Sequence, residues 1–251
     1  MNLTGIVLAG GKSSRLGFNK IGIKIGKIPL FINQVFKLSY FCDEILISSS
    51  EENFNFLSKE LKLLEKYHTY FNNFIEKIRL PAVSLLIDDI KIKSGPAFIE
   101  PGPLLGIYTG LANSKNFYSF VVGFDMPFIS YNLISNIIKI KDSQKCSQDK
   151  CKDIISINTL KGFEALCSIY SKNCIEIIKK NLKSGKYKIS DIFSELDVKI
   201  ITQKELEILN IDELNFFNIN TVKDLEKFKE LWATANTENN FVSKWKQVFY
   251  R

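Results

Sequence analysis

The sequence predicts a single-domain α/β protein in which a mostly parallel, Rossmann-like sheet is flanked by helices. Short apolar runs of strand length alternate along the chain with longer segments of helical period, which is typical of parallel strands joined by helices. A glycine-rich turn directly follows the first apolar run, as it does in sheets that bind a ligand at their carboxyl edge. With 251 residues, the chain is long enough to bury one large core. We therefore expect one domain over residues 1–233, followed by a C-terminal tail, 234–251, with the apolar pattern of a docking helix.

The glycine-rich turn has the composition of a phosphate-binding loop. The first predicted strand, residues 6–8, leads into Gly10 and Gly11, and two serines follow. Glycines let backbone amides approach a ligand closely, because no Cβ intervenes. Three cations surround the turn, namely Lys12, Arg15 and Lys20. Amides and cations together suit a triphosphate. The spacing matches neither a Walker loop nor a dinucleotide fingerprint.

The remaining elements follow from hydrophobic period and from glycine and proline positions. Strands are predicted at 44–48, 83–87, 117–123, 154–156, 165–170, 198–201 and 216–221, with a short alternating piece at 21–27. Helices are predicted from Pro29 onward, at 102–111, 175–182, 188–193 and 222–231.

A heptad stripe predicts one further, long helix over residues 56–79, inserted between two strands. Its apolar positions recur at alternating spacings of 4 and 3: Leu57, Leu61, Leu64, His68, Phe71, Ile75 and Ile78. Packing of this face on the parent domain is the favoured interpretation, and pairing with a partner helix is the alternative. His68, the single histidine, is expected at the boundary of the core and not as a metal ligand.

Polar side chains follow several of the predicted strands at their carboxyl ends. They are Ser48, Asp89, Asp125, Asn218 and Asn220. Since ligands bind beyond the carboxyl ends of parallel strands, we expect these groups to converge with the glycine-rich turn. Asp125 precedes Pro127, which stops the strand, and its carboxylate suits Mg²⁺ together with phosphate oxygens. A cap on the helix beginning near Ser130 is the alternative role for Asp125.

Composition narrows the class of partner. Lys and Arg outnumber Asp and Glu by 34 to 27, which favours anionic ligands, but no dense basic block predicts nucleic-acid binding. No apolar run reaches the length of a membrane span. The five cysteines form no C-x-x-C motif, so we expect reduced thiols and a cytoplasmic location.

These motifs together resemble a known family. Residues 8–20 resemble the signature L-A-G-G-x-S-x-R-(M/L)-G-x-x-K of nucleotidyltransferases, and residues 102–106 match G-P-L-x-G. Residues 123–128 resemble a C-D-x-P-(F/Y) segment, and residues 217–224 a closing F-x-N-x-N-T-x-x-D segment. The L-A-G-G start is similar to that of the molybdenum cofactor guanylyltransferases, so the resemblance implies a nucleotide-diphospho-sugar-transferase-like fold.

The resemblance also implies a reaction: transfer of GMP from GTP to the terminal phosphate of molybdopterin or molybdenum cofactor, with Mg²⁺ as cofactor and pyrophosphate as product. It assigns nucleotide contacts to Leu8, Ala9, Gly10, Gly11, Lys20, Ser48, Asp89 and Asp125. The resemblance also implies that Lys20, Arg15 and Asp125 are catalytic, that Asp125 binds the metal, and that Asn218 and Asn220 bind the acceptor. Proteins that handle the cofactor or mature molybdoenzymes are the partners it suggests.

Two alternatives stay open at this point. Ser48 stands where the guanylyltransferases often carry Asn, which leaves room for a cytidylyl- or sugar-phosphate nucleotidyltransferase of the same fold. A non-catalytic nucleotide-binding protein that uses the long helix and the tail is the other alternative. Retention of both Lys20 and Asp125 argues against it.

Overall fold

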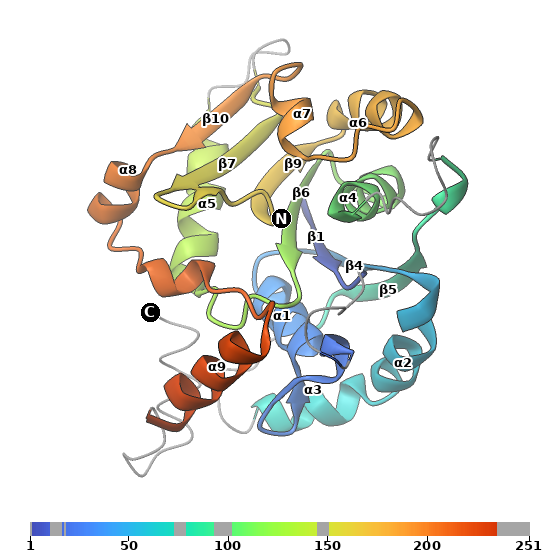
Figure 1. The fold of residues 1–251 in the computed structure, drawn as a ribbon, viewed down its shortest axis with the longest axis vertical. Helices are drawn as coiled ribbons and strands as arrows, with labels where there is room; N and C mark the ends of the chain where they lie inside the picture. The colour runs from blue at the N-terminus through green and yellow to red at the C-terminus, as the bar shows by residue number, and fades with distance from the viewer. Residues whose placement is uncertain are drawn as a thin grey trace.

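The computed structural model describes residues 2–10, 17, 19–72, 79–92, 102–144 and 151–234, and confirms the α/β class (Figure 1). Its main sheet has eight strands among these residues, in the order β10-β7-β9-β6-β1-β4-β5, with β8 paired to β7. The strands are β1 (Leu3–Leu8), β4 (Glu44–Ser49), β5 (Ala82–Ile87), β6 (Tyr118–Gly123), β7 (Ile154–Thr159), β8 (Gly162–Phe163), β9 (Cys167–Ser171) and β10 (Val198–Ile201). A separate hairpin pairs β2 (Lys24–Ile25) with β3 (Ile28–Pro29).

Strand direction places the polar strand ends on one edge of this sheet. β1 pairs in parallel with both β4 and β6, and β4 pairs in parallel with β5. β9 runs antiparallel to β6 and β7, so β7 and β10 again point the same way as β1. The carboxyl ends of β1, β4, β5 and β6 therefore meet at one edge, where β9 begins. We call this the carboxyl edge.

Helices cover both faces of the sheet (Figure 1). The α-helices are α1 (Leu30–Ser39), α2 (Glu51–Leu61), α3 (Leu64–Asn72), α4 (Gly102–Asn113), α5 (Tyr131–Ser143), α6 (Cys174–Lys183), α7 (Ser190–Phe193), α8 (Gln203–Ile208) and α9 (Val222–Thr234). Short 3₁₀ helices are η1 (Lys20–Gly22), η2 (Ile90–Ile92) and η3 (Glu213–Phe216).

The strands separate two hydrophobic cores by simple alternation. Val7 packs in the core that contains α1 and α5, whereas Ile6 and Leu8 pack in the core that contains α4 and α6. Neighbouring residues of β6 divide in the same way, with Phe120 in the first core and Val121 in the second. Successive strand residues point to opposite faces, and both faces are buried, which explains the continuous apolar runs in the sequence.

The single long helix expected over 56–79 is wrong for the described residues. The chain forms α2, turns at Lys62 and Leu63, and continues as α3, while 73–78 lie outside the described residues. Packing on the parent domain is confirmed at Leu57 and Phe71, which are 0 % and 1 % exposed and belong to the first core. His68 is half-buried, as a boundary residue should be.

Three further expectations meet the structure. The strand predicted at 216–221 is wrong, because η3 ends at Phe216 and the following residues form no strand. Cys42, Cys167 and Cys174 are free and buried, but Cys151 is disulfide-bonded, so the expectation of five reduced thiols is wrong. Within the described ranges, no helix is long and apolar enough to cross a membrane. The predicted tail lies almost wholly outside those ranges.

Candidate active site

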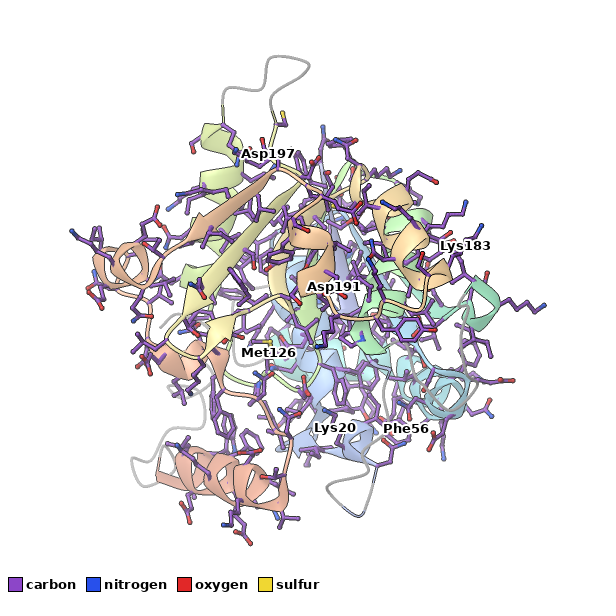
Figure 2. All side chains as sticks on the ribbon, turned by 45° about the horizontal axis from the view of Figure 1, so that its top comes forward. Lys20, Phe56, Met126, Lys183, Asp191 and Asp197 are labelled. Atoms are coloured by element: carbon purple, nitrogen blue, oxygen red, sulfur yellow. The ribbon has the colours of Figure 1, made fainter. Side chains whose placement is uncertain are left out.

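Lys20 and Asp125 form an ion pair at the carboxyl edge. The Lys20 Nζ atom lies 2.5 Å from the Asp125 Oδ2 atom, and the two side chains are only 14 % and 13 % exposed. The same ammonium lies 3.4 Å from Asn220 Oδ1 and 5.4 Å from the centre of the Phe124 ring. Figure 2 shows Lys20 and Met126, the residue after Asp125, on the same side of the molecule. The fold thus joins a cation, a carboxylate and an amide from three distant segments.

A chain of amide side chains holds Lys20 in place. Asn19 caps η1 by accepting a hydrogen bond from the Ile21 N–H, and its Nδ2 donates to Asn53 Oδ1 over 2.7 Å. Asn53, which is 2 % exposed, in turn donates to the Ala9 carbonyl over 2.9 Å. Asn53 was not among the residues predicted from the sequence to lie at this site. Its position in the first turn of α2, just after β4, is the one signal that it lies near the carboxyl edge.

Asp125 sits in a turn whose backbone is bound on both sides. The Phe124 N–H donates to the Leu8 carbonyl over 3.2 Å, which extends the β1–β6 pairing beyond the strand. The Asp125 carbonyl accepts from the Ile219 N–H over 3.0 Å. Ser130 caps α5 through its own hydroxyl, so the helix-cap alternative for Asp125 is excluded. The Asp125 carboxylate is therefore directed to Lys20.

A second polar group lies beside the ends of β4 and β5. Ser48 donates a short hydrogen bond to the Asp88 Oδ1 atom, and Asp88 Oδ2 faces Gly10, 3.2 Å from where a Cβ would stand. From the sequence, Asp89 was the acid expected at this position. In the structure Asp89 is exposed and accepts from the Lys91 N–H of its own turn. The acid next to Ser48 is Asp88.

Burial raises the pKa of Asp88 to about 6, although hydrogen bonds from the Ser48 and Thr109 hydroxyls oppose the shift. Around Ser48 and Asp88, α4 approaches the strands closely. A Cβ on Gly106 would stand 2.9 Å from Ser48 Oγ and 3.0 Å from Leu8 Cδ2. Glycine at 106 therefore allows α4, which contains the G-P-L-x-G match, to contact the ends of β1 and β4.

The other predicted site residues divide into three groups. Leu8 and Ala9 contribute backbone at the edge, and the Ala9 N–H already donates to the Ser48 carbonyl. Asn218 donates its amide to the Phe216 carbonyl and, unlike Asn220, shows no hydrogen bond to Lys20. Gly11 and Arg15 lie outside the described residues.

The fit of a divalent cation depends on Asp125. Nowhere in the described ranges do three or more His, Cys, Asp or Glu side chains form a group that could hold a metal ion on its own. A single carboxylate still suits Mg²⁺, which is commonly held by one or two carboxylates and by substrate phosphate oxygens. Asp125 fits this kind of site, and Lys20 would then face the same phosphates.

The fold and this edge define the class: an α/β nucleotidyltransferase. The family model of the MobA-like NTP transferase domain matches residues 5–200, and the chain belongs to that family. A molybdenum cofactor guanylyltransferase from Desulfosudis oleivorans is 28 % identical over 227 residues, which cover 90 % of this chain and 93 % of that protein.

Solved structures are similar in fold. Molybdopterin-guanine dinucleotide biosynthesis protein A from Archaeoglobus fulgidus aligns with a TM-score of 0.66 at 20 % identity, covering 92 % of this chain and 99 % of that one. A nucleotidyl transferase from Methanothermobacter thermautotroptrophicus aligns with a TM-score of 0.56 at 10 % identity, covering 93 % and 99 %. At these identities the likeness concerns the fold alone, and it agrees with the predicted class.

Proposed function

We propose that this protein transfers GMP from GTP to the terminal phosphate of molybdopterin or molybdenum cofactor, in a Mg²⁺-dependent reaction that releases pyrophosphate. The observation that carries the proposal is the ion pair between Lys20 and Asp125, 105 residues apart in sequence, at the carboxyl edge of a family-typical sheet. The name of the Desulfosudis relative supports the choice of donor and acceptor.

The proposed step balances without a covalent intermediate. An oxygen of the acceptor phosphate attacks the α-phosphorus of GTP, the bond from that phosphorus to the bridging oxygen breaks, and pyrophosphate leaves. The attacking oxygen is already ionised, so no general base is required. What the protein must supply is alignment of two anions and neutralisation of their charge.

Lys20 and Asp125 suit this task in complementary ways. In the proposed complex, the Lys20 ammonium would donate to phosphate oxygens, and the Asp125 carboxylate would hold Mg²⁺. Bound Mg²⁺ would supply further neutralisation of triphosphate charge. Asn220, next to Lys20, is proposed to contact the acceptor, with Asn218 in the same segment. The direct Lys20–Asp125 contact keeps both side chains at the reacting position before the ligand arrives.

The guanine is proposed to bind beside Gly10 at the carboxyl edge, against the Asp88 carboxylate. An ionised carboxylate accepts hydrogen bonds from the N1–H and the exocyclic amino group of guanine, a pair of donors that cytosine, uracil and adenine do not present together. Asp88 therefore replaces Asp89 in the assignment, with Ser48 holding Oδ1 of its carboxylate.

The experiment is to incubate the protein with Mg²⁺, molybdopterin and each of the four ribonucleoside triphosphates, and to follow pyrophosphate. We expect release with GTP, only when the acceptor is present. Faster release with CTP would instead support the cytidylyl alternative. Tight GTP binding without release would support a non-catalytic nucleotide-binding protein.

A further inference from the structure

Two polar side chains of α1 are buried in the core beneath the Asp125 turn. Gln34 is 1 % exposed and Lys37 is 0 % exposed, and they lie three residues apart on one face of the helix. Gln34 Nε2 donates to the Met126 carbonyl over 2.6 Å, and Lys37 Nζ donates to the Pro127 carbonyl over 2.8 Å. The two acceptors are the carbonyls that directly follow Asp125.

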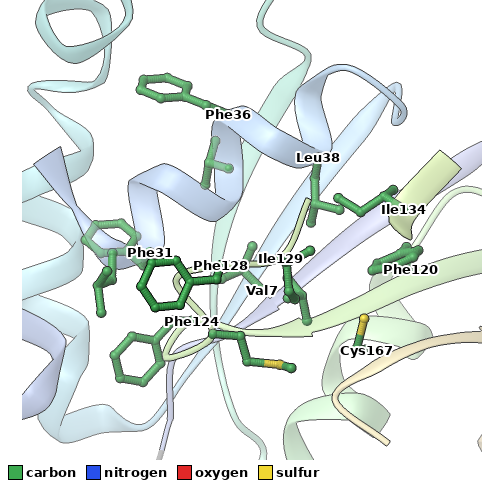
Figure 3. Packing of buried hydrophobic residues seen from close by; sticks show 14 of the residues in the cluster. Val7, Phe31, Phe36, Leu38, Phe120, Phe124, Phe128, Ile129, Ile134 and Cys167 are labelled. Atoms are coloured by element: carbon green, nitrogen blue, oxygen red, sulfur yellow. The ribbon is translucent and has the colours of Figure 1, made fainter. Parts of the chain in front are cut away.

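Three consecutive carbonyls of this turn are thus bound from outside it. The Asp125 carbonyl accepts from Ile219, and the next two accept from α1. Phe128 closes the turn on the other side, with its ring centre 5.7 Å from those of Phe217 and Phe228. Figure 3 shows Phe128 and Ile129 packed beneath α1. The backbone that carries Asp125 therefore cannot shift without breaking bonds to α1 or to the C-terminal segment.

A lysine at this place combines a desolvation cost with a hydrogen bond to a buried carbonyl. Complete burial lowers the pKa of Lys37 to about 7, which reflects the desolvation that its ammonium undergoes in the fold. Apolar residues of similar length are often at least as stabilising as buried ionisable ones. At this place the lysine provides a long donor for the Pro127 carbonyl, which is turned into the core.

We propose that Gln34 and Lys37 are positioning residues, which fix the backbone after Asp125 so that its carboxylate is presented to the cation and to Lys20. Neither side chain touches the substrate. The inference rests on the proposed function, because it takes Asp125 as the residue that holds the metal. A displacement of about 1 Å in such a carboxylate can lower turnover by about a hundredfold.

The variants Gln34→Met and Lys37→Met remove the donors while keeping side-chain length. The matched control is Phe36→Leu, on the same helix, where the side chain is 0 % exposed and packs on Phe71 with ring centres 4.6 Å apart, away from the turn. Two readouts are compared: Mn²⁺ affinity in the presence of GTP, measured by electron paramagnetic resonance, and the separate changes in kcat and in KM for GTP.

We expect both methionine variants to weaken Mn²⁺ binding about tenfold and to lower kcat by about 10- to 100-fold, with KM for GTP changed less than about threefold. Phe36→Leu should lower the melting temperature without changing either readout. Gln34→Met removes only a neutral donor, so this variant tests the positioning role if Lys37→Met does not fold.

The inference is overturned if the methionine variants lose stability like Phe36→Leu and keep wild-type Mn²⁺ affinity and kcat. A measurement on Asp125→Ala separates this result from failure of the proposed function. If Asp125→Ala binds Mn²⁺ as the wild type does, the metal assignment is wrong and the positioning role is wrong with it. If Asp125→Ala loses the ion and the methionine variants do not, only the positioning role is wrong.

Discussion

GTP affinity should depend on pH through Asp88. The carboxylate accepts hydrogen bonds from guanine only when it is ionised, and its pKa in the folded protein is raised to about 6. About nine tenths of the molecules carry the ionised form at pH 7, and about one tenth at pH 5. We therefore expect the dissociation constant for GTP to rise about tenfold between pH 7 and pH 5.

The variant Asp88→Asn tests the same contact at fixed pH. The amide keeps the size of the side chain but loses the negative charge and presents donors as well. Loss of hydrogen bonds to a charged group costs about 1.5–3 kcal/mol, which corresponds to a 10- to 150-fold weaker GTP complex at pH 7. Its affinity should no longer fall below pH 6 in the wild-type manner.

Titration calorimetry at pH 5, 6 and 7 measures both effects. Asp89→Asn is the matched control, because Asp89 is exposed and bonded within its own turn. Wild-type affinity that is unchanged from pH 7 to pH 5 would refute the reasoning. So would an Asp88→Asn variant that binds GTP normally while Asp89→Asn does not, since the acid chosen from the sequence alone would then be the correct one.

Three further predictions follow from single contacts. Lys20→Met should lower kcat and weaken GTP binding together, with a loss of about 2–4 kcal/mol in kcat/KM, whereas Asp125→Ala should raise the barrier reported by kcat by a similar amount without unfolding the protein. Steady-state kinetics and circular dichroism measure both effects, and near-wild-type turnover of Asp125→Ala would contradict its metal role. Gly106→Ala should displace Ser48 and weaken GTP binding, whereas Gly110→Ala, whose Cβ would meet Ile6 at 2.7 Å, should reduce stability by about 1–3 kcal/mol and leave GTP affinity unchanged. Equal effects of the two variants on GTP affinity would argue against a GTP contact at Ser48 and Asp88. In urea unfolding, Phe71→Ala should destabilise the fold by about 3–5 kcal/mol, because Phe71 is buried, and Leu64→Ala by under about 2 kcal/mol, because Leu64 is half-buried. The reverse order would contradict the observed packing.

The sequence was sufficient for the parts of the fold that depend on pattern. The apolar run at 44–48 became β4, because a strand buried on both faces is recognisable from its continuous apolar residues alone. The run at 83–87 became β5, an edge strand whose residues are half-buried or exposed. The meeting of Lys20 with Asp125 at the carboxyl edge was predictable too. Parallel strands carry their carboxyl ends to one edge whatever the loops between them do.

The structure differs from the sequence-based expectations where one residue or one long-range contact decides the outcome. Successive residues at a strand end point to opposite sides, so a pair such as Asp88 and Asp89 cannot be resolved from sequence. The Asp88 N–H still pairs with the Ser49 carbonyl, which keeps Asp88 in the strand geometry. The heptad spacing over 56–79 does not reveal the turn between α2 and α3. A buried hydrogen bond from the Tyr67 hydroxyl to the Glu60 carboxylate spans this turn.

Residues that support the site were invisible for a related reason. Asn53, Gln34 and Lys37 act through hydrogen bonds to backbone carbonyls 44, 92 and 90 residues away. The sequence around a polar residue on a helix does not show which distant backbone carbonyl its side chain will bind. Such contacts become apparent only when the helix is packed against the sheet.

The central claim is the transfer of the α-phosphoryl group with its nucleoside. It is tested most directly by supplying GTP labelled with ³²P at the α-phosphate or, separately, at the γ-phosphate, together with Mg²⁺ and molybdopterin. We expect the α-label to appear in the pterin product and the γ-label in pyrophosphate, in equal amounts. Release of γ-label as inorganic phosphate, with α-label remaining in GDP, would contradict it.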